Sequence, residues 1–66
     1  MRAFVAFYES DCRACDSYYE CFIGVFSSLE DAQKCPNANE VREMQGSEEL
    51  AIWYFTNGAW AKIWEK

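Results

Sequence analysis

The chain has 66 residues, with eleven acidic and six basic side chains, no histidine and a formal net charge of −5. A chain of this length forms one domain and buries only about 60% of its unfolded surface, so its core is small. The negative charge disfavours direct contact with nucleic acid or an anionic membrane and favours a basic protein surface. We therefore expect a single acidic domain, residues 1–66, with a protein as its partner.

The N-terminal segment MRAFVAFYES does not match a signal peptide, because its apolar stretch is short and Glu9 and Asp11 follow at once. No stretch approaches the roughly 20 apolar residues of a membrane span. We expect a cytoplasmic protein without membrane contact. In that compartment reduced cysteines are favoured over disulfides.

The first part of the chain predicts two strands joined by a loop. Residues 2–9 are almost all apolar, which is typical of a strand inside a sheet. Residues 10–17 are polar and turn-forming, and residues 18–26 form a second strand. The two strands are close in sequence, so a hairpin is the expected arrangement.

A short helix follows the second strand. Ser27 or Ser28 can cap its N-terminus, with Glu30 or Asp31 completing a capping box. Pro36 limits the helix, because the residue before a proline avoids the α region. We expect a helix of about two turns.

The C-terminal part predicts a connection and a second hairpin. Residues 37–46 fit a short helical turn or a mobile connection equally well. Residues 50–56 and 59–65 flank Asn57-Gly58, which is the strongest short-range signal for a type I′ turn. These two segments should therefore pair as antiparallel strands.

The resulting order ββαββ predicts an α+β fold in which one helix covers a four-stranded sheet. The first strand is apolar on both faces, so we expect it at the centre with the last strand beside it. That arrangement is the β-grasp, or ubiquitin-like, fold. The alternative is a four-stranded meander with the helix across it.

The turn also predicts which side chains of the C-terminal hairpin share a face. One face is small and aliphatic, with Ile52 opposite Ile63; the other is aromatic, with Phe55 opposite Trp60 and Trp53 opposite Lys62. If the helix covers the aliphatic face, the aromatic face is partly open to a partner. Alternatively, these rings shelter one another or are covered by residues 37–46.

The four cysteines give a weak metal signal. Cys12 and Cys15 have the CxxC spacing of a zinc site, but a second such pair is missing. The rises of strand and helix place Cys35 near Cys21 and away from the loop. We interpret Cys21 and Cys35 as small buried apolar residues and expect no metal and no cofactor. The state of the Cys12 and Cys15 thiols stays open.

No arrangement of residues indicates catalysis. Without histidine, general acid–base work would need carboxylates or thiols, and none of them falls in a recognisable motif. The three glycines form no phosphate-binding loop. We expect a binding protein rather than an enzyme.

The acids gather in groups, and the interval from Glu9 to Asp31 holds six acids and one arginine. Carboxylates spread over a compact surface imitate phosphates, so a channel lined by lysine and arginine would attract them. The alternative is a solvated surface that keeps a small protein soluble. The predicted contact set combines acids with the aromatic face: Glu9, Asp11, Asp16, Glu20, Glu30, Asp31, Trp53, Phe55 and Trp60.

The segment Gly24 to Ala32, GVFSSLEDA, joins a strand to a Ser-capped helix. In this segment, and in size, charge and element order, the chain resembles small phage-encoded anti-CRISPR proteins. The resemblance is to inhibitors of type I systems that have an acidic surface and a ubiquitin-like fold. It implies binding to a basic surface of a Cas subunit in the infected bacterial host, which blocks recognition of target DNA.

The resemblance implies no catalytic residue, and we expect a monomer that does not bind nucleic acid directly. Two other hypotheses stay open. One is a small cysteine-dependent metal-binding module. The other is a phage structural or interaction protein with an aromatic dimer face.

Overall fold

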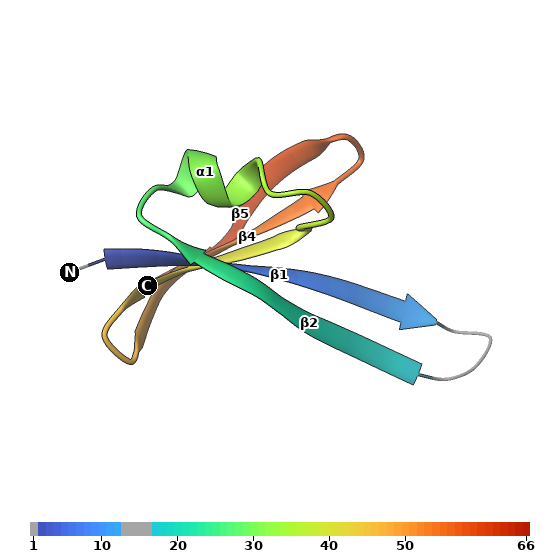
Figure 1. Cartoon of the computed structure of the whole chain (residues 1–66), viewed down its shortest axis with the longest axis horizontal. Coiled ribbons are helices and arrows are strands. Elements are labelled where there is room, and N and C mark those ends of the chain that lie inside the picture. The colour runs from blue at the N-terminus through green and yellow to red at the C-terminus, as the bar shows by residue number, and fades with distance from the viewer. Residues whose placement is uncertain (1, 13–16) are drawn as a thin grey trace.

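The computed structural model describes the backbone of residues 2–12 and 17–66, and the side chains of residues 2–10 and 18–66. The described residues form five strands and one short helix: β1 (Arg2–Cys12), β2 (Ser17–Phe26), α1 (Leu29–Gln33), β3 (Glu40–Gln45), β4 (Glu48–Thr56) and β5 (Ala59–Glu65). The strands make one antiparallel sheet in the order β2-β1-β3-β4-β5, and α1 lies across one of its faces (Figure 1).

The predicted four-stranded β-grasp fold is wrong. The sheet has five strands, and β1 lies between β2 and β3 rather than beside the last strand. The last strand, β5, lies at the opposite edge and pairs with β4. The additional strand is β3, which occupies the segment predicted to be a helical turn or a mobile connection.

β3 was missed because its sequence, EVREMQ, is polar for a strand in the middle of a sheet. Glu40 and Glu43 are nevertheless buried there. Each carboxylate has a cationic partner, because Arg42 pairs with Glu40 and Arg2 pairs with Glu43. Such pairing is what makes a buried charge tolerable.

Two tight turns connect the C-terminal strands. Asn57 and Gly58 have φ values of 55° and 82°, as the predicted type I′ turn requires. Gly46, with φ of 62°, lies in the turn between β3 and β4 and fits the first position of a type II′ turn. Gly46-Ser47 is itself a hairpin signal, and it could have located β3 from the sequence.

The register predicted for the C-terminal hairpin is confirmed from the turn as far as the pair Trp53 and Lys62. A bulge between Ile52 and Trp53 then shifts the pairing, so that Ile52 faces Trp64 instead of Ile63. The side chains of Ile63 and Trp64 are about half exposed at this edge of the sheet.

α1 begins where the sequence predicts but is only five residues long. Ser28 is its N-cap, and the hydroxyl accepts a hydrogen bond of 3.2 Å from the Asp31 N–H. Ala32 is fully buried and forms the centre of the core with Ala6 of β1 and Val41 of β3. These small side chains allow α1 to lie close against the sheet.

α1 lies on the same face of the sheet as the aromatic side of the C-terminal hairpin, not the aliphatic side, and its main contacts are with β1, β2 and β3. Val41 faces Trp53 across β3 and β4, and both Trp53 and Trp60 pack against the core. Phe55 is 45% exposed and meets Trp60 edge to face, with ring centroids 5.5 Å apart. The side chains at the alternate positions of each strand therefore point to the face away from α1.

Cys21 and Cys35 are free thiols that are half-buried rather than fully buried. The prediction for Cys12 and Cys15 concerns side chains outside the described residues. In the part of the chain that the structure describes, no helix is both long and apolar enough to cross a membrane.

Candidate functional site

The outer part of the β1–β2 hairpin projects beyond the rest of the sheet (Figure 1). β1 and β2 are the longest strands, with 11 and 10 residues, whereas β3 pairs with β1 only from Arg2 to Phe7. Beyond Phe7, β1 keeps its pairing with β2 as far as Cys12 and Ser17. We call residues 8–12 and 17–21 the hairpin arm.

Asn39 anchors the base of the hairpin arm. Its side-chain oxygen accepts a hydrogen bond of 2.8 Å from the Glu9 N–H, and its amide donates one of 2.7 Å to the Glu9 carbonyl. Its backbone N–H donates to the Phe7 carbonyl, and its carbonyl accepts from the Phe55 N–H. Asn39 thus holds Glu9 beside the start of β3.

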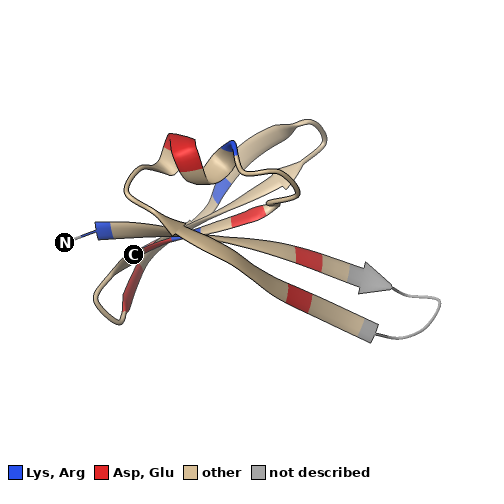
Figure 2. Cartoon of the chain, viewed as in Figure 1, with Lys and Arg blue, Asp and Glu red and all other residues tan. Residues whose placement is uncertain are grey.

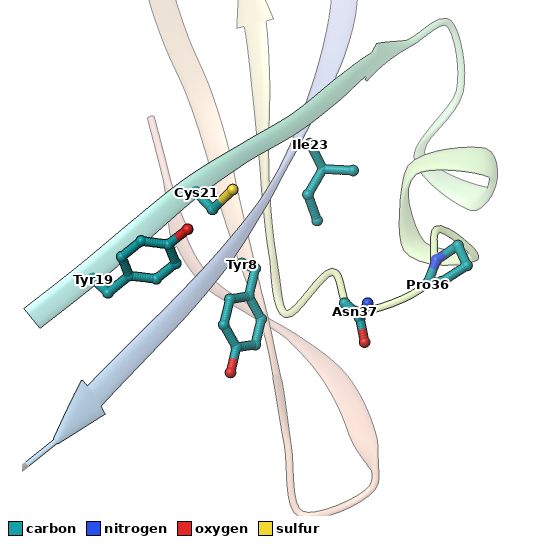
Figure 3. Close-up of a pocket in the computed structure, with 6 residues that line it drawn as sticks. All are labelled: Tyr8, Tyr19, Cys21, Ile23, Pro36 and Asn37. Carbon is teal, nitrogen blue, oxygen red and sulfur yellow. The ribbon is translucent and has the colours of Figure 1, made fainter.

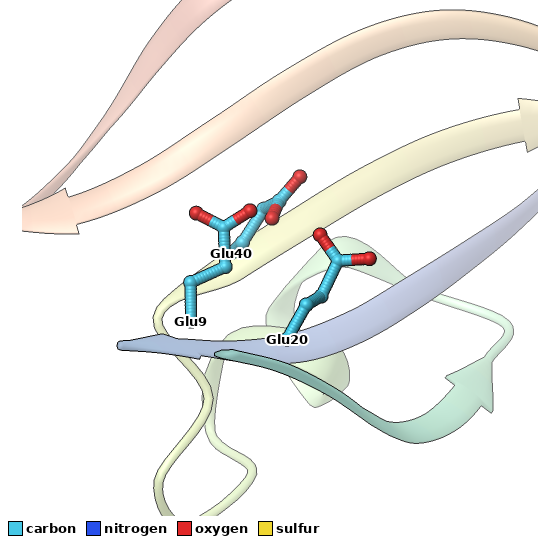
Figure 4. Close-up of side chains that lie close together, drawn as sticks. All are labelled: Glu9, Glu20 and Glu40. Carbon is cyan, nitrogen blue, oxygen red and sulfur yellow. The ribbon is translucent and has the colours of Figure 1, made fainter. Parts of the chain in front are cut away.

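Three glutamates from three neighbouring strands converge here, on the face away from α1. Glu20 of β2 pairs directly with Glu9 of β1, and Glu40 of β3 lies opposite Phe7, two residues before Glu9. Strand alternation therefore puts all three carboxylates on one face. One oxygen of each lies within 4.8 Å of the others, and Figure 4 shows the side chains turned toward one another. We call these residues the glutamate cluster.

Arg42 is the cation that meets the glutamate cluster. Its Nε donates to Glu40 Oε2 at 2.5 Å, and its Nη2 donates to Glu20 Oε2 at 3.1 Å. Its Nη1 lies 3.6 Å from a carboxylate oxygen of Glu49. The guanidinium also lies over the Phe7 ring, 4.7 Å from the centroid. The cluster and Glu49 thus place four carboxylates beside one guanidinium, which leaves three formal negative charges.

Tyr18 closes the outer side of the glutamate cluster. Its hydroxyl lies 2.8 Å from Glu9 Oε1 and 3.1 Å from Glu20 Oε2, so it donates to one or the other. The hydrogen bond to Glu9, together with the nearby negative charge, raises the pKa of the Tyr18 hydroxyl far above its usual value. The hydroxyl therefore stays protonated and acts as a donor.

Glu40 is the buried member, with a side chain only 1% exposed. Its Oε2 binds Arg42, whereas its Oε1 has no hydrogen-bond partner. Burial, and then the neighbouring Glu9, raise the pKa of Glu40 to about 7 against the opposing effect of Arg42. Although burial opposes the change, the neighbouring Glu40 side chain and the hydrogen bond from Tyr18 lower the pKa of Glu9. Glu40 therefore holds a proton more readily than Glu9 does.

Of the acids in the predicted contact set, the structure brings together Glu9 and Glu20. Glu30 and Asp31 lie on α1, on the other side of the sheet, and Glu30 is paired with Lys34. Figure 2 shows these acidic positions on α1 well apart from those on the hairpin arm. The described acids therefore do not form one continuous surface.

The remaining members of the predicted set lie elsewhere or outside the described residues. Trp53 and Trp60 are half-buried against the core, and Phe55 is the most exposed of the three rings. The side chains of Asp11 and Asp16 are outside the described residues.

Arg42, Glu40 and Tyr18 were not in the predicted contact set. Glu40 and Arg42 are two residues apart, so they share a face once β3 is recognised as a strand. The signal that could have located them is the Gly46-Ser47 turn, which marks the end of that strand. Placing Tyr18 at the cluster required the pairing of β1 with β2 to be known, because its hydrogen-bond partners lie on both strands.

A separate hollow of about 550 Å³ lies between the hairpin arm and the segment after α1 (Figure 3). The rings of Tyr8 and Tyr19, whose centroids are 6.4 Å apart, form one side of this hollow. The residues that line it are Tyr8, Tyr19, Cys21, Ile23, Pro36 and Asn37. These side chains carry no formal charge, so the hollow lacks the charged groups that would orient an ionic ligand.

The glutamate cluster is the candidate functional site, because it concentrates negative charge at the base of the projecting hairpin arm. Its carboxylates can accept hydrogen bonds from lysine or arginine, or can ligate a metal cation. Comparisons with protein-family models, curated proteins and solved structures find no match for the chain.

Proposed function

We propose that the chain is a small binding protein that occupies a basic protein surface through the hairpin arm and the glutamate cluster. The observation that carries this proposal is the charge imbalance around Arg42, whose single guanidinium meets the three carboxylates of the cluster and that of Glu49. The other described basic side chains are each paired with an acid elsewhere: Arg2 with Glu43, Lys34 with Glu30, Lys62 with Glu65 and Lys66 with Glu48.

The exposed side chains of the hairpin arm support this role. Tyr18 and Tyr19 are 63% and 57% exposed, and they lie on opposite faces of β2. Phe22 continues the apolar surface next to the cluster and is 59% exposed. Tyrosine combines a large contact area with a hydrogen-bonding group and few rotatable bonds, which suits it to binding surfaces. A partner would thus meet carboxylates flanked by aromatic rings.

Within this class, we propose a CRISPR effector complex as the partner and the blocking of target-DNA recognition as the outcome. This choice is based on the resemblance of residues 24–32, the acidity and the small size of the chain. A channel that holds nucleic acid presents lysine and arginine, and such a channel steers an acidic protein toward itself. The chain would act by occupancy in the host cytoplasm, as a monomer, without catalysis or a cofactor.

The test compares the glutamate cluster with a matched acid outside it. Cells with an active type I system express the wild type, the double variant Glu9→Gln/Glu20→Gln, or Glu65→Gln, and phage plaques are counted. Affinity for the purified effector complex is measured at about 50 and 500 mM salt, with EDTA present. Circular dichroism confirms that each variant is folded.

We expect the double variant to lose inhibition and to bind about tenfold or more weakly. Glu65 is exposed and pairs with Lys62 in the wild type, away from the cluster, so Glu65→Gln should behave like the wild type. Wild-type affinity should fall steeply with salt. Full inhibition by the folded double variant, or affinity independent of salt, would overturn the proposal.

A further inference from the structure

The glutamate cluster has a feature that attraction to a basic partner does not explain. Glu40 Oε1 is buried and has no hydrogen-bond partner, although Glu9 and Glu20 each offer an oxygen within 4.8 Å of an oxygen of Glu40. A buried carboxylate oxygen without a donor is costly, and two neighbouring carboxylates repel it further. We propose that the glutamate cluster binds one divalent cation of the class that prefers oxygen ligands: Ca²⁺, Mg²⁺ or Mn²⁺.

The spacing of the carboxylates fits a single ion. Ca²⁺ binds oxygen at about 2.4 Å, so two oxygens on the same ion are at most about 4.8 Å apart. The ligand oxygens of Glu9, Glu20 and Glu40 lie within that limit of one another. Three carboxylate ligands, without sulfur or imidazole, favour a hard cation over zinc or copper.

The ligands are held by paired strands rather than by a loop. Glu20, Glu9 and Glu40 come from β2, β1 and β3, which are neighbours in the sheet. Asn39 binds the Glu9 backbone through two hydrogen bonds, and Tyr18 lies between the Glu9 and Glu20 carboxylates. Because the groups are already oriented, little conformational entropy is lost when an ion binds.

Arg42 sets the charge that an ion would meet. It binds Oε2 of both Glu40 and Glu20, and Oε1 of Glu40 is left for a ligand. Together with Glu49, the glutamate cluster and Arg42 have a formal charge of −3, which a divalent cation compensates more fully than a monovalent cation does.

Water can complete the coordination of such an ion. A hollow of about 250 Å³ adjoins the cluster, and Glu9, Tyr18, Asn39 and Tyr54 are among its lining residues. Both Ca²⁺ and Mg²⁺ keep several oxygen ligands beyond three carboxylates, and water commonly supplies them. Glu9 lines this hollow, whereas Glu20 and Glu40 do not, so the room for the remaining ligands lies on the Glu9 side of the site.

The experiment uses the full chain after removal of metal with EDTA and dialysis. CaCl₂, MgCl₂ and MnCl₂ are titrated separately by calorimetry, and thermal unfolding is recorded with and without each salt. Because protons compete with cations for carboxylate oxygens, the measurements are made at about pH 8. Tb³⁺ gives a second readout, since nearby tyrosines excite its luminescence.

We expect one ion per chain for at least one of the three salts, and a rise in Tm of several degrees at saturating salt. Glu40→Gln should weaken binding at least tenfold and abolish the Tb³⁺ signal, whereas Glu65→Gln should leave both unchanged. No binding of any of the three ions up to about 10 mM, or equal binding by the folded Glu40→Gln variant, would overturn the inference. It does not depend on the proposed partner, because the affinity for that partner is measured in EDTA, so each proposal can fail separately.

Discussion

Arg42 and Glu40 form the least exposed of the described ion pairs, with Nε and Oε2 separated by 2.5 Å and the Glu40 side chain 1% exposed. The two residues lie two positions apart on β3, so both side chains point away from α1. Their pairing allows a polar segment to run between β1 and β4, because each charge compensates the other where water is excluded. The same pair fixes the orientation of the Glu40 carboxylate in the glutamate cluster. One ion pair thus supports both the fold and the candidate site.

Arg42→Met tests this support. The variant keeps an unbranched apolar stem but leaves Glu40 buried without its cation. We expect the free energy of unfolding to fall by about 3 kcal/mol at pH 8, measured by urea unfolding in EDTA. The double variant Glu40→Leu/Arg42→Met should recover most of that loss, since buried ion pairs can often be replaced by apolar residues. An equal loss in the double variant would show that the pair is not the cause.

The raised pKa of Glu40, about 7 in the fold against 4.5 for a free glutamate, predicts how stability depends on pH. The folded state binds the Glu40 proton more tightly than the unfolded state does. The stabilising contribution of Glu40 to the free energy of unfolding is therefore fully present below about pH 4.5 and is lost as the pH rises through about 7. The loss is up to about 3 kcal/mol. Glu9 acts in the opposite sense, because its lowered pKa makes its contribution disappear as the pH falls below its usual range.

Urea unfolding in EDTA between pH 4 and pH 9 checks this dependence. We expect the wild type to be most stable on the acid side of neutrality and to lose stability toward pH 8. Glu40→Gln cannot titrate at this position, so its curve should be flat through pH 7. A wild-type curve that rises between pH 5 and pH 8 would refute the assignment of the raised pKa to Glu40.

Asn39→Asp tests the anchor of the hairpin arm. The substituted carboxylate can still accept from the Glu9 N–H but cannot donate to the Glu9 carbonyl, and it adds a negative charge beside the cluster. We expect a loss of about 2 kcal/mol in unfolding free energy and faster amide hydrogen exchange at Glu9. Asn37→Asp is the control, because Asn37 is exposed and lies two residues before Asn39. Its φ is 70°, a backbone conformation that aspartate also tolerates. Similar exchange at Glu9 in both variants would argue against the anchoring role.

Gly46→Ala tests the turn that precedes β4. The φ of 62° at Gly46 is a conformation that alanine adopts only with strain, although no atom would contact the added Cβ within 4 Å. We expect a cost of about 1 kcal/mol in urea unfolding, arising from the backbone alone. Ser47→Ala, at the neighbouring turn position without a positive φ, should change stability by less than about 0.5 kcal/mol. Equal effects of the two substitutions would remove the backbone explanation.

The separation of the acids into two groups predicts unequal effects on partner binding. Glu30→Lys/Asp31→Lys reverses the charges at the start of α1, on the other side of the sheet from the glutamate cluster. We expect this double variant to weaken binding to the effector complex by no more than about threefold, through long-range repulsion alone. A loss as large as that of Glu9→Gln/Glu20→Gln would place the contact on α1 instead.

Local signals in the sequence were sufficient for the local structure. The Ser28 cap and the Asn57-Gly58 turn depend on residues within three or four positions, and both occur where predicted. The apolar composition of residues 2–9 and 18–26 likewise located β1 and β2. These features could be predicted because each is decided by short-range backbone and side-chain chemistry.

The Gly46-Ser47 turn marks the end of a strand, but only the tertiary structure decided that residues 40–45 lie inside the sheet, which face α1 covers, and that Glu9, Glu20 and Glu40 meet. A pattern of apolar residues cannot reveal a strand whose buried side chains are charged, because their burial depends on partners far away in the sequence. Arg42 supplies that partner only after β3 has paired between β1 and β4. The sequence by itself thus determined an acidic chain with two hairpins and a capped helix, whereas long-range strand pairing assembled its carboxylates into a site.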